Sequence, residues 1–151
     1  VELMGACDDA EREVNVCVGK EWYRFPSSFF LPGHHCHLRF LESGFKGQLP
    51  RPYDQEHGTW GAPDSFNDLN QEEPERYLPE DQCDYIVDLE VHDQAEERYT
   101  SRADWQVLDK WPFLDAGQSP SKLFRAFYFP ALSPNRNVFA NYLLLKRVTT
   151  N

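Results

Sequence analysis

The apolar residues of this 151-residue chain fall into short segments separated by proline, glycine, asparagine and aspartate. In the first segment Val14, Val16 and Val18 alternate with polar or small residues, which places three β-branched side chains on one face of a strand. Further strands are predicted at residues 38–41, 85–91, 123–129 and 138–145, which are short and rich in aromatic or branched side chains. The pattern therefore favours five or six strands.

A single clear helix is predicted, at residues 101–111. Ser101 can cap it, and Trp105 and Leu108 fall near helical spacing. Pro112 would then end the helix, because proline cannot donate a backbone hydrogen bond.

Residues 48–79 contain five prolines and two glycines, which predicts a long surface connection. Together with the strands and the helix, this gives a β-rich α+β fold. We expect an antiparallel sheet or sandwich with one or two short helices. Residues 1–14 would form a loose lead-in, and residues 15–151 would form a single globular domain.

Charge is distributed unevenly along the chain. The formal net charge of -10 would repel a phosphate backbone, so nucleic acid is not an expected partner. After Asp115, however, the last 36 residues contain five basic side chains and no acidic one. This asymmetry is either solvated surface charge without a function or a cationic face for an anionic partner.

Membrane-spanning and signal segments are not expected within the chain. It has no apolar run of about 18 residues, and its N-terminus lacks the positive start and apolar core of a signal peptide. It begins at Val1 rather than at methionine, as an excised fragment or a processed product would.

The densest group of candidate binding residues lies in the string CVGKEWYRFPSSFFLP, at residues 17–32. Side chains alternate along a strand, so Lys20, Trp22 and Arg24 would share one face, with an indole ring between two cations. Aromatic rings stack on sugars, and lysine and arginine complement phosphate, so a glycolipid headgroup is a sensible ligand. The alternative is that Trp22 is a core residue whose charged neighbours extend to water.

The string HHCH at residues 34–37 resembles a metal-binding sequence. Adjacent strand residues point to opposite faces, so only two of the four side chains converge easily, and two ligands are too few. We expect a surface turn there and no metal.

Asp88 and Glu90 alternate along the predicted strand at residues 85–91. This spacing would suit the paired carboxylates of a glycoside hydrolase, but it is also that of the solvated face of a half-buried strand, which we favour. The chain has no phosphate-binding glycine loop and no nucleophile elbow, so no cofactor is expected.

Several unusual strings occur in one order, namely CVGKEWYRFPSSFFLP, LRFLESGFKGQLPRPY, NDLNQEEPERYLP, CDYIVDLEV, PFLDA, RAFYFP and NYLLLKR. Together they resemble the C-terminal lumenal domain of the dolichyl-phosphate-mannose-dependent alpha-1,2-mannosyltransferases of the asparagine-linked glycosylation pathway, which are GT-C enzymes. The similarity runs from about Asn15 to Arg147. It is weak in the first dozen residues and at residues 57–65 and 92–101.

The resemblance implies that the chain is the lumenal domain of a multi-pass membrane enzyme of the endoplasmic reticulum. Such an enzyme transfers mannose from dolichyl-phosphate mannose to a dolichyl-diphosphate oligosaccharide. Its acidic catalytic residue lies in an early lumenal loop between transmembrane helices, so no catalytic residue is expected here. The implied partners are the membrane-embedded part of the same polypeptide and the dolichyl-linked oligosaccharide acceptor, whose side of the cleft the domain would shape.

Two other functions fit the same sequence, a free-standing carbohydrate-binding module and a structural domain that supports the membrane part. An exposed Trp22 beside Lys20 and Arg24 would favour contact with a ligand. A buried Trp22, with an exposed apolar patch elsewhere, would favour the structural role.

The four cysteines lack CxxC spacing, which argues against a zinc ribbon or a thioredoxin-type site. Four cysteines allow three complete pairings, and the sequence does not choose among them. In the lumenal setting that the resemblance implies, Cys17 and Cys83 are the expected pair, because both lie at strand boundaries inside family-like strings. Cys7 lies in the lead-in and Cys36 in the histidine turn.

Overall fold

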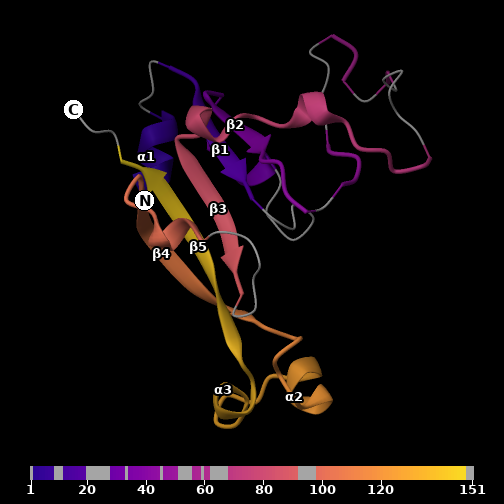
Figure 1. Cartoon of the computed structure of the whole chain (residues 1–151), viewed down its shortest axis with the longest axis vertical. Helices are drawn as coiled ribbons and strands as arrows, with labels where there is room; N and C mark the ends of the chain where they lie inside the picture. The colour runs from indigo at the N-terminus through magenta and orange to yellow at the C-terminus, as the bar shows by residue number, and fades with distance from the viewer. Residues whose placement is uncertain are drawn as a thin grey trace.

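A computed structural model of the chain describes residues 2–8, 12–19, 28–32, 34–44, 46–50, 56–58, 60–61, 68–91 and 98–148. Within these residues, five strands form one sheet in the order β2-β1-β3-β5-β4 (Figure 1). The strands are β1 (Val14–Val18), β2 (Cys36–Phe40), β3 (Tyr85–Glu90), β4 (Trp105–Leu114) and β5 (Phe139–Arg147). The α-helices are α1 (Glu2–Asp8), α2 (Lys122–Ala126) and α3 (Ser133–Arg136). Short 3-10 helices occupy η2 (Ser28–Phe30), η3 (Pro74–Arg76), η4 (Glu80–Gln82) and η5 (Tyr99–Ser101).

The sheet is mixed. Strand β1 runs parallel to both β2 and β3, whereas β5 runs antiparallel to β3 and β4. The β-rich α+β class is therefore confirmed. The predicted antiparallel arrangement is wrong for β1, which pairs in parallel with β2 and β3. Parallel strands need a long crossover, and the connection from Val18 to Cys36 supplies one.

Three of the predicted strands, at residues 38–41, 85–91 and 138–145, are confirmed as β2, β3 and β5 with small shifts of their ends. The alternation at the start of the chain is confirmed as well. Val14 and Val16 pack with Tyr85 on one face of the sheet, where Leu3 and Ala6 of α1 cover them. This burial is what the period-2 pattern specifies.

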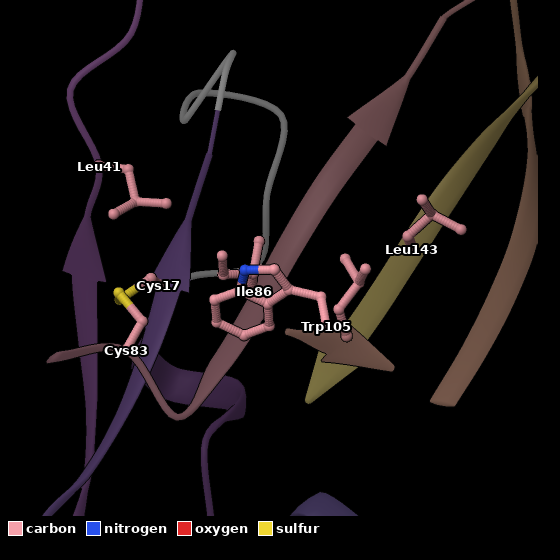
Figure 2. Close-up of a cluster of buried hydrophobic side chains, with 7 residues drawn as sticks. Cys17, Leu41, Cys83, Ile86, Trp105 and Leu143 are labelled. Atoms are coloured by element: carbon pink, nitrogen blue, oxygen red, sulfur yellow. A yellow bond between two sulfur atoms is a disulfide. The ribbon is translucent and has the colours of Figure 1, made fainter. Parts of the chain in front are cut away.

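The opposite face of the sheet carries a second core cluster of buried side chains. Figure 2 shows the disulfide between Cys17 and Cys83 and the indole of Trp105 within it. The cluster consists of Cys17, Leu41, Cys83, Ile86, Trp105, Leu143 and Leu145. Both faces of the sheet are thus covered where β1 and β3 cross its centre.

The helix predicted at residues 101–111 is wrong. Trp105–Leu114 is strand β4, which pairs along β5 at the edge of the sheet. Its register with β5 shifts between Val107 and Asp109, so Leu108 is an extra residue that interrupts the alternation and gives the apolar residues a spacing close to that of a helix. Pro112 is tolerated because β4 is an edge strand.

The strand predicted at residues 123–129 is also wrong. Lys122–Ala126 forms helix α2, and the Ser121 hydroxyl accepts a hydrogen bond from the backbone N–H of Phe124 at 3.4 Å. A serine N-cap satisfies one of the free donors at the start of a helix. The aromatic composition indicated a strand, but the serine cap allows a helical turn, and no strand among the described residues pairs with this segment.

Part of the predicted lead-in is ordered. Helix α1 lies within residues 1–14, and its Cys7 is buried in a disulfide with Cys36 at the start of β2. Within the segment expected to be a loose lead-in, Glu2–Asp8 is therefore helical. The physical reason is the covalent link, which holds a short helix against the sheet when its own hydrogen bonds would not.

Candidate functional site

The candidate binding residues Lys20, Trp22 and Arg24 lie outside the described residues. Gly19, the last described residue before them, donates its backbone N–H to the carbonyl of Val87 at 3.1 Å. A Cβ atom at Gly19 would lie 2.7 Å from Oδ1 of Asp88, so this position requires glycine unless the carboxylate moves. Immediately after β1, the backbone therefore lies close against β3.

The carboxylates predicted to form a solvated strand face lie in less exposed positions. Asp88 is 1% exposed, so the prediction is wrong for this residue. The Glu90 side chain is 10% exposed, and its two oxygens accept hydrogen bonds from the Thr100 hydroxyl at 3.0 and 2.9 Å. Arg98 lies 3.4 Å from the same carboxylate. Burial follows from β3 being a central strand, which is covered on both faces.

A pocket of about 340 Å³ lies near the carboxyl end of β2. It is lined by Leu41, Glu42, Tyr77, Leu78, Pro79, Glu80 and Tyr99. This volume is at the lower end of the range of small-molecule sites. Two tyrosine rings and two carboxylates are a suitable composition for a sugar, which uses stacking on its apolar face and hydrogen bonds to its hydroxyls.

The rim of this pocket is held by a charge network. Lys46 Nζ lies 2.6 Å from Glu42 Oε1 and 3.1 Å from Glu72 Oε1, and it sits 5.8 Å from the centre of the Tyr77 ring. The Tyr77 hydroxyl donates to Glu72 at 2.9 Å. This hydrogen bond, followed by the one from Lys46, lowers the pKa of Glu72. The network therefore favours the ionised form of Glu72 and orients both carboxylates.

The floor of the pocket is tied to the sheet by two arginines. Arg102 contacts Glu80 at 2.7 Å and Asp104 at 2.6 Å, and its hydrogen bond lowers the pKa of Asp104. Arg147 donates to the carbonyls of Cys83, at 2.8 Å, and Glu80, and its guanidinium lies 4.4 Å from the centre of the Trp105 ring. Glu80 is therefore a structural ion-pair partner as well as a lining residue.

The cysteines are paired in two disulfides. Cys17 and Cys83, the pair expected from the resemblance, lie together with Cα atoms 5.8 Å apart. Cys7 and Cys36 form a second disulfide, with Cα atoms 5.5 Å apart, which sequence reasoning missed. The even cysteine count was the available signal, but the ordered helix around Cys7 was not foreseen.

No metal centre is formed by the described residues, where no group of three or more histidine, cysteine, aspartate or glutamate side chains could hold an ion. In the HHCH string, Cys36 is engaged in its disulfide, and His34 and His35 are exposed. His37 Nε2 lies 3.7 Å from Glu13 Oε1.

An aromatic and cationic surface at the end of the β4–β5 hairpin was missed by the sequence reasoning. Its exposed apolar side chains are Leu123, Phe127, Tyr128, Phe129 and Leu132. Its cations are Lys122, Arg125 and Arg136. We call these eight residues the tip. The available signal was the aromatic run at residues 127–129 within the part of the chain that has no acidic residue.

Known proteins with similar sequences share a single enzymatic name. The chain is 50% identical over 139 residues to the mouse protein named alpha-1,2-mannosyltransferase ALG9, an alignment that covers 89% of the chain. The protein of that name from Arabidopsis thaliana is 36% identical over 149 residues, or 97% of the chain. The Saccharomyces cerevisiae protein of that name is 34% identical over 127 residues, or 78% of the chain.

The chain spans only 22% of the length of the mouse protein, 26% of the Arabidopsis protein and 22% of the yeast protein. No family model and no solved structure matches it. Among the described residues, every helix is too short or too polar to cross a bilayer.

Proposed function

This chain is homologous over most of its length to one segment of the alpha-1,2-mannosyltransferases, and we propose that it is a non-catalytic lumenal domain of such an enzyme. The whole protein would transfer mannose from dolichyl-phosphate mannose to the dolichyl-diphosphate oligosaccharide during assembly of the N-glycan precursor in the endoplasmic reticulum. The names of the relatives support the mannosyl transfer, and the donor and acceptor follow from the resemblance stated above.

The engagement of the carboxylates supports a non-catalytic role. Glu42 pairs with Lys46, Glu80 pairs with Arg102, and Glu90 accepts from Thr100. A general base must be within hydrogen-bond reach of the hydroxyl that it activates and must be free to accept its proton. These three side chains instead bind neighbouring parts of the fold, so their evident role is structural.

The position of the pocket supports a role on the acceptor side. Because β1 and β2 are parallel, Gly19 and Leu41 follow strands that end at the same edge of the sheet. Lys20, Trp22 and Arg24 follow Gly19 in the sequence, and Leu41 lines the pocket with Tyr77. We propose that this edge contacts the oligosaccharide or the diphosphate of the acceptor.

The purified 151-residue chain is expected to transfer no mannose, because the catalytic residue would lie in another part of the enzyme. The measurement is incubation with radiolabelled dolichyl-phosphate mannose and a lipid-linked acceptor, with the whole enzyme as the positive control. Product formation that co-purifies with the chain through two chromatographic steps would contradict the proposal.

Replacing both Lys20 and Arg24 by glutamine in the whole enzyme is expected to weaken acceptor use at least tenfold. Each cation would make a charge-assisted contact with phosphate, worth about 1.5–3 kcal/mol. The measurement is kcat/KM for the acceptor at saturating donor, together with the amount of folded enzyme.

The matched control for this variant is Lys110→Gln, which removes a cation from the edge strand β4 at the other side of the sheet. Its acceptor kinetics should match those of the unmodified enzyme. If the Lys20 and Arg24 variant also stays within twofold, these residues do not contact the acceptor. A loss of folded protein would instead assign them to structural ion pairs.

The pocket also supports a second candidate function, a carbohydrate-binding module without an enzymatic parent. Tyr77 and Tyr99 line a cavity of suitable size, together with the carboxylates of Glu42 and Glu80. The two functions can be distinguished by the other segments that the same reading frame encodes. A reading frame that encodes transmembrane segments together with this domain would favour the mannosyltransferase.

A further inference from the structure

The tip lies far from the candidate acceptor edge. Strand β3 pairs with β5 from Tyr85 to Glu90, and the β4–β5 hairpin continues beyond it. Figure 1 shows α2 and α3 at the end of this extension, away from β1 and β2. The connection between β4 and β5 therefore projects from the sheet.

The apolar side chains of the tip are exposed together. Phe127 is 60% exposed, Tyr128 is 67% exposed and Leu132 is 50% exposed. Single exposed apolar residues are ordinary on a protein surface, but a group of aromatic side chains within one short segment indicates an interaction site.

The conformation of the tip is fixed by hydrogen bonds beneath these side chains. Ser133 is fully buried, and its hydroxyl accepts from the N–H of Phe129 at 2.8 Å and donates to the carbonyl of Phe127 at 3.4 Å. Asn137 donates to the carbonyl of Phe124 at 2.8 Å. The turn is thus built around backbone groups. Phe129 packs edge-to-face against Phe124, with ring centres 5.9 Å apart, while the rings of Phe127 and Tyr128 stay at the surface.

Cations flank the aromatic residues. Lys122 and Arg136 are exposed, and Arg125 of α2 donates to the carbonyl of Ala116 at 2.7 Å, which ties α2 to the turn that follows β4. No acidic residue occurs after Asp115, so the positive charge of the tip is not neutralised by carboxylates from its own segment. An extended anionic surface would complement this charge.

We propose that the tip binds the surface of a phospholipid bilayer. Aromatic side chains occupy the boundary between headgroups and acyl chains, and arginine and lysine contact the phosphates above it. Phe127 and Tyr128 would enter this boundary while Lys122 and Arg136 contact headgroups. The hairpin would then hold the acceptor edge of the sheet at a set distance from the membrane. The membrane-binding surface is therefore different from the proposed acceptor site.

The test is sedimentation of the disulfide-bonded chain with vesicles of phosphatidylcholine, with and without phosphatidylserine. The chain should bind both, and more strongly when phosphatidylserine is present. Phe127→Ser with Tyr128→Ser should lower the partition coefficient at least about tenfold on both vesicles, because two buried rings are lost. Lys122→Gln with Arg136→Gln should lower it about fivefold per cation on anionic vesicles.

Trp60→Ser is the matched control, since Trp60 is 95% exposed and lies outside the tip. Its partition coefficient should not change. The proposal is overturned if the unmodified chain does not bind vesicles, if the tip variants bind as well as it does, or if Trp60→Ser loses as much binding. Self-association that the Phe127 and Tyr128 replacements abolish, without vesicle binding, would assign the tip to a second copy of the chain.

This assay contains neither mannose donor nor acceptor. Its failure therefore leaves the proposed mannosyltransferase function unaffected, and failure of that function leaves the vesicle result unaffected. Circular dichroism and thermal unfolding of each variant establish that the fold is retained. If the aromatic replacements unfold the chain, the Lys122 and Arg136 replacements on anionic vesicles decide the question.

Discussion

Replacing Cys17 and Cys83 by alanine is expected to lower the free energy of unfolding by about 4 kcal/mol. Their disulfide joins residues separated by 66 positions, so its loss gives the unfolded chain much conformational freedom. Both residues are also buried in the cluster that contains Ile86 and Trp105, so the folded state loses packing contacts as well. The measurement is urea unfolding monitored by tryptophan fluorescence.

The matched control is replacement of Cys7 and Cys36 by alanine. This disulfide has a sequence separation of 29, so its loss should cost about 3.5 kcal/mol in the same entropic description. The loss should also be more local, because it releases α1 from β2. An equal or greater destabilisation by the Cys7 and Cys36 variant would contradict this ranking. A mass spectrum showing four free thiols in the unmodified protein would contradict both disulfides.

Replacing Trp105 by alanine is expected to cost about 3–5 kcal/mol, the usual range for a large aromatic side chain in a core. Trp105 is 5% exposed, and its ring contacts Tyr99 in an edge-to-face arrangement at 6.0 Å. It also stacks beneath Arg147, which links β5 to the segment that lines the pocket. The substitution therefore leaves a cavity in the core and loosens the pocket. Chemical denaturation measures the loss.

Trp111→Ala is the matched control, because Trp111 lies on the same strand and is 48% exposed. It should change the free energy of unfolding by about 0.5 kcal/mol or less, as at most surface positions. Similar costs for the two tryptophans would mean that β4 does not pack as described.

The candidate site was accessible from the sequence only in part. Lys20, Trp22 and Arg24 are predicted binding residues because aromatic and basic residues alternate there, and this prediction lies outside the described residues. The pocket was not found, since Leu41, Tyr77 and Tyr99 come from three separate segments that only the folded chain brings together. The tip was not predicted, because an aromatic run of this kind is typical of a buried strand. Only the structure shows that these side chains are exposed.

The local pattern of the sequence determined the elements at the centre of the sheet. In β1 the spacing of the apolar side chains matches the faces that are buried, and in β3 and β5 the apolar composition and the flanking turn residues indicate the strand and limit its length. The sequence also determined the homology and the separation of acidic and basic regions along the chain. Each of these properties depends on residue identity or near-neighbour spacing, which the sequence states directly.

The tertiary structure decided the rest. Leu108 at the bulge of β4 gives its apolar residues an apparent helical spacing, and only the long pairing with β5 makes this segment a strand. The parallel placement of β2, the Cys7–Cys36 disulfide and the burial of Asp88 likewise depend on partners distant in the sequence. A short segment gains too little from its own hydrogen bonds to fix its conformation, so the partner against which it packs makes the choice.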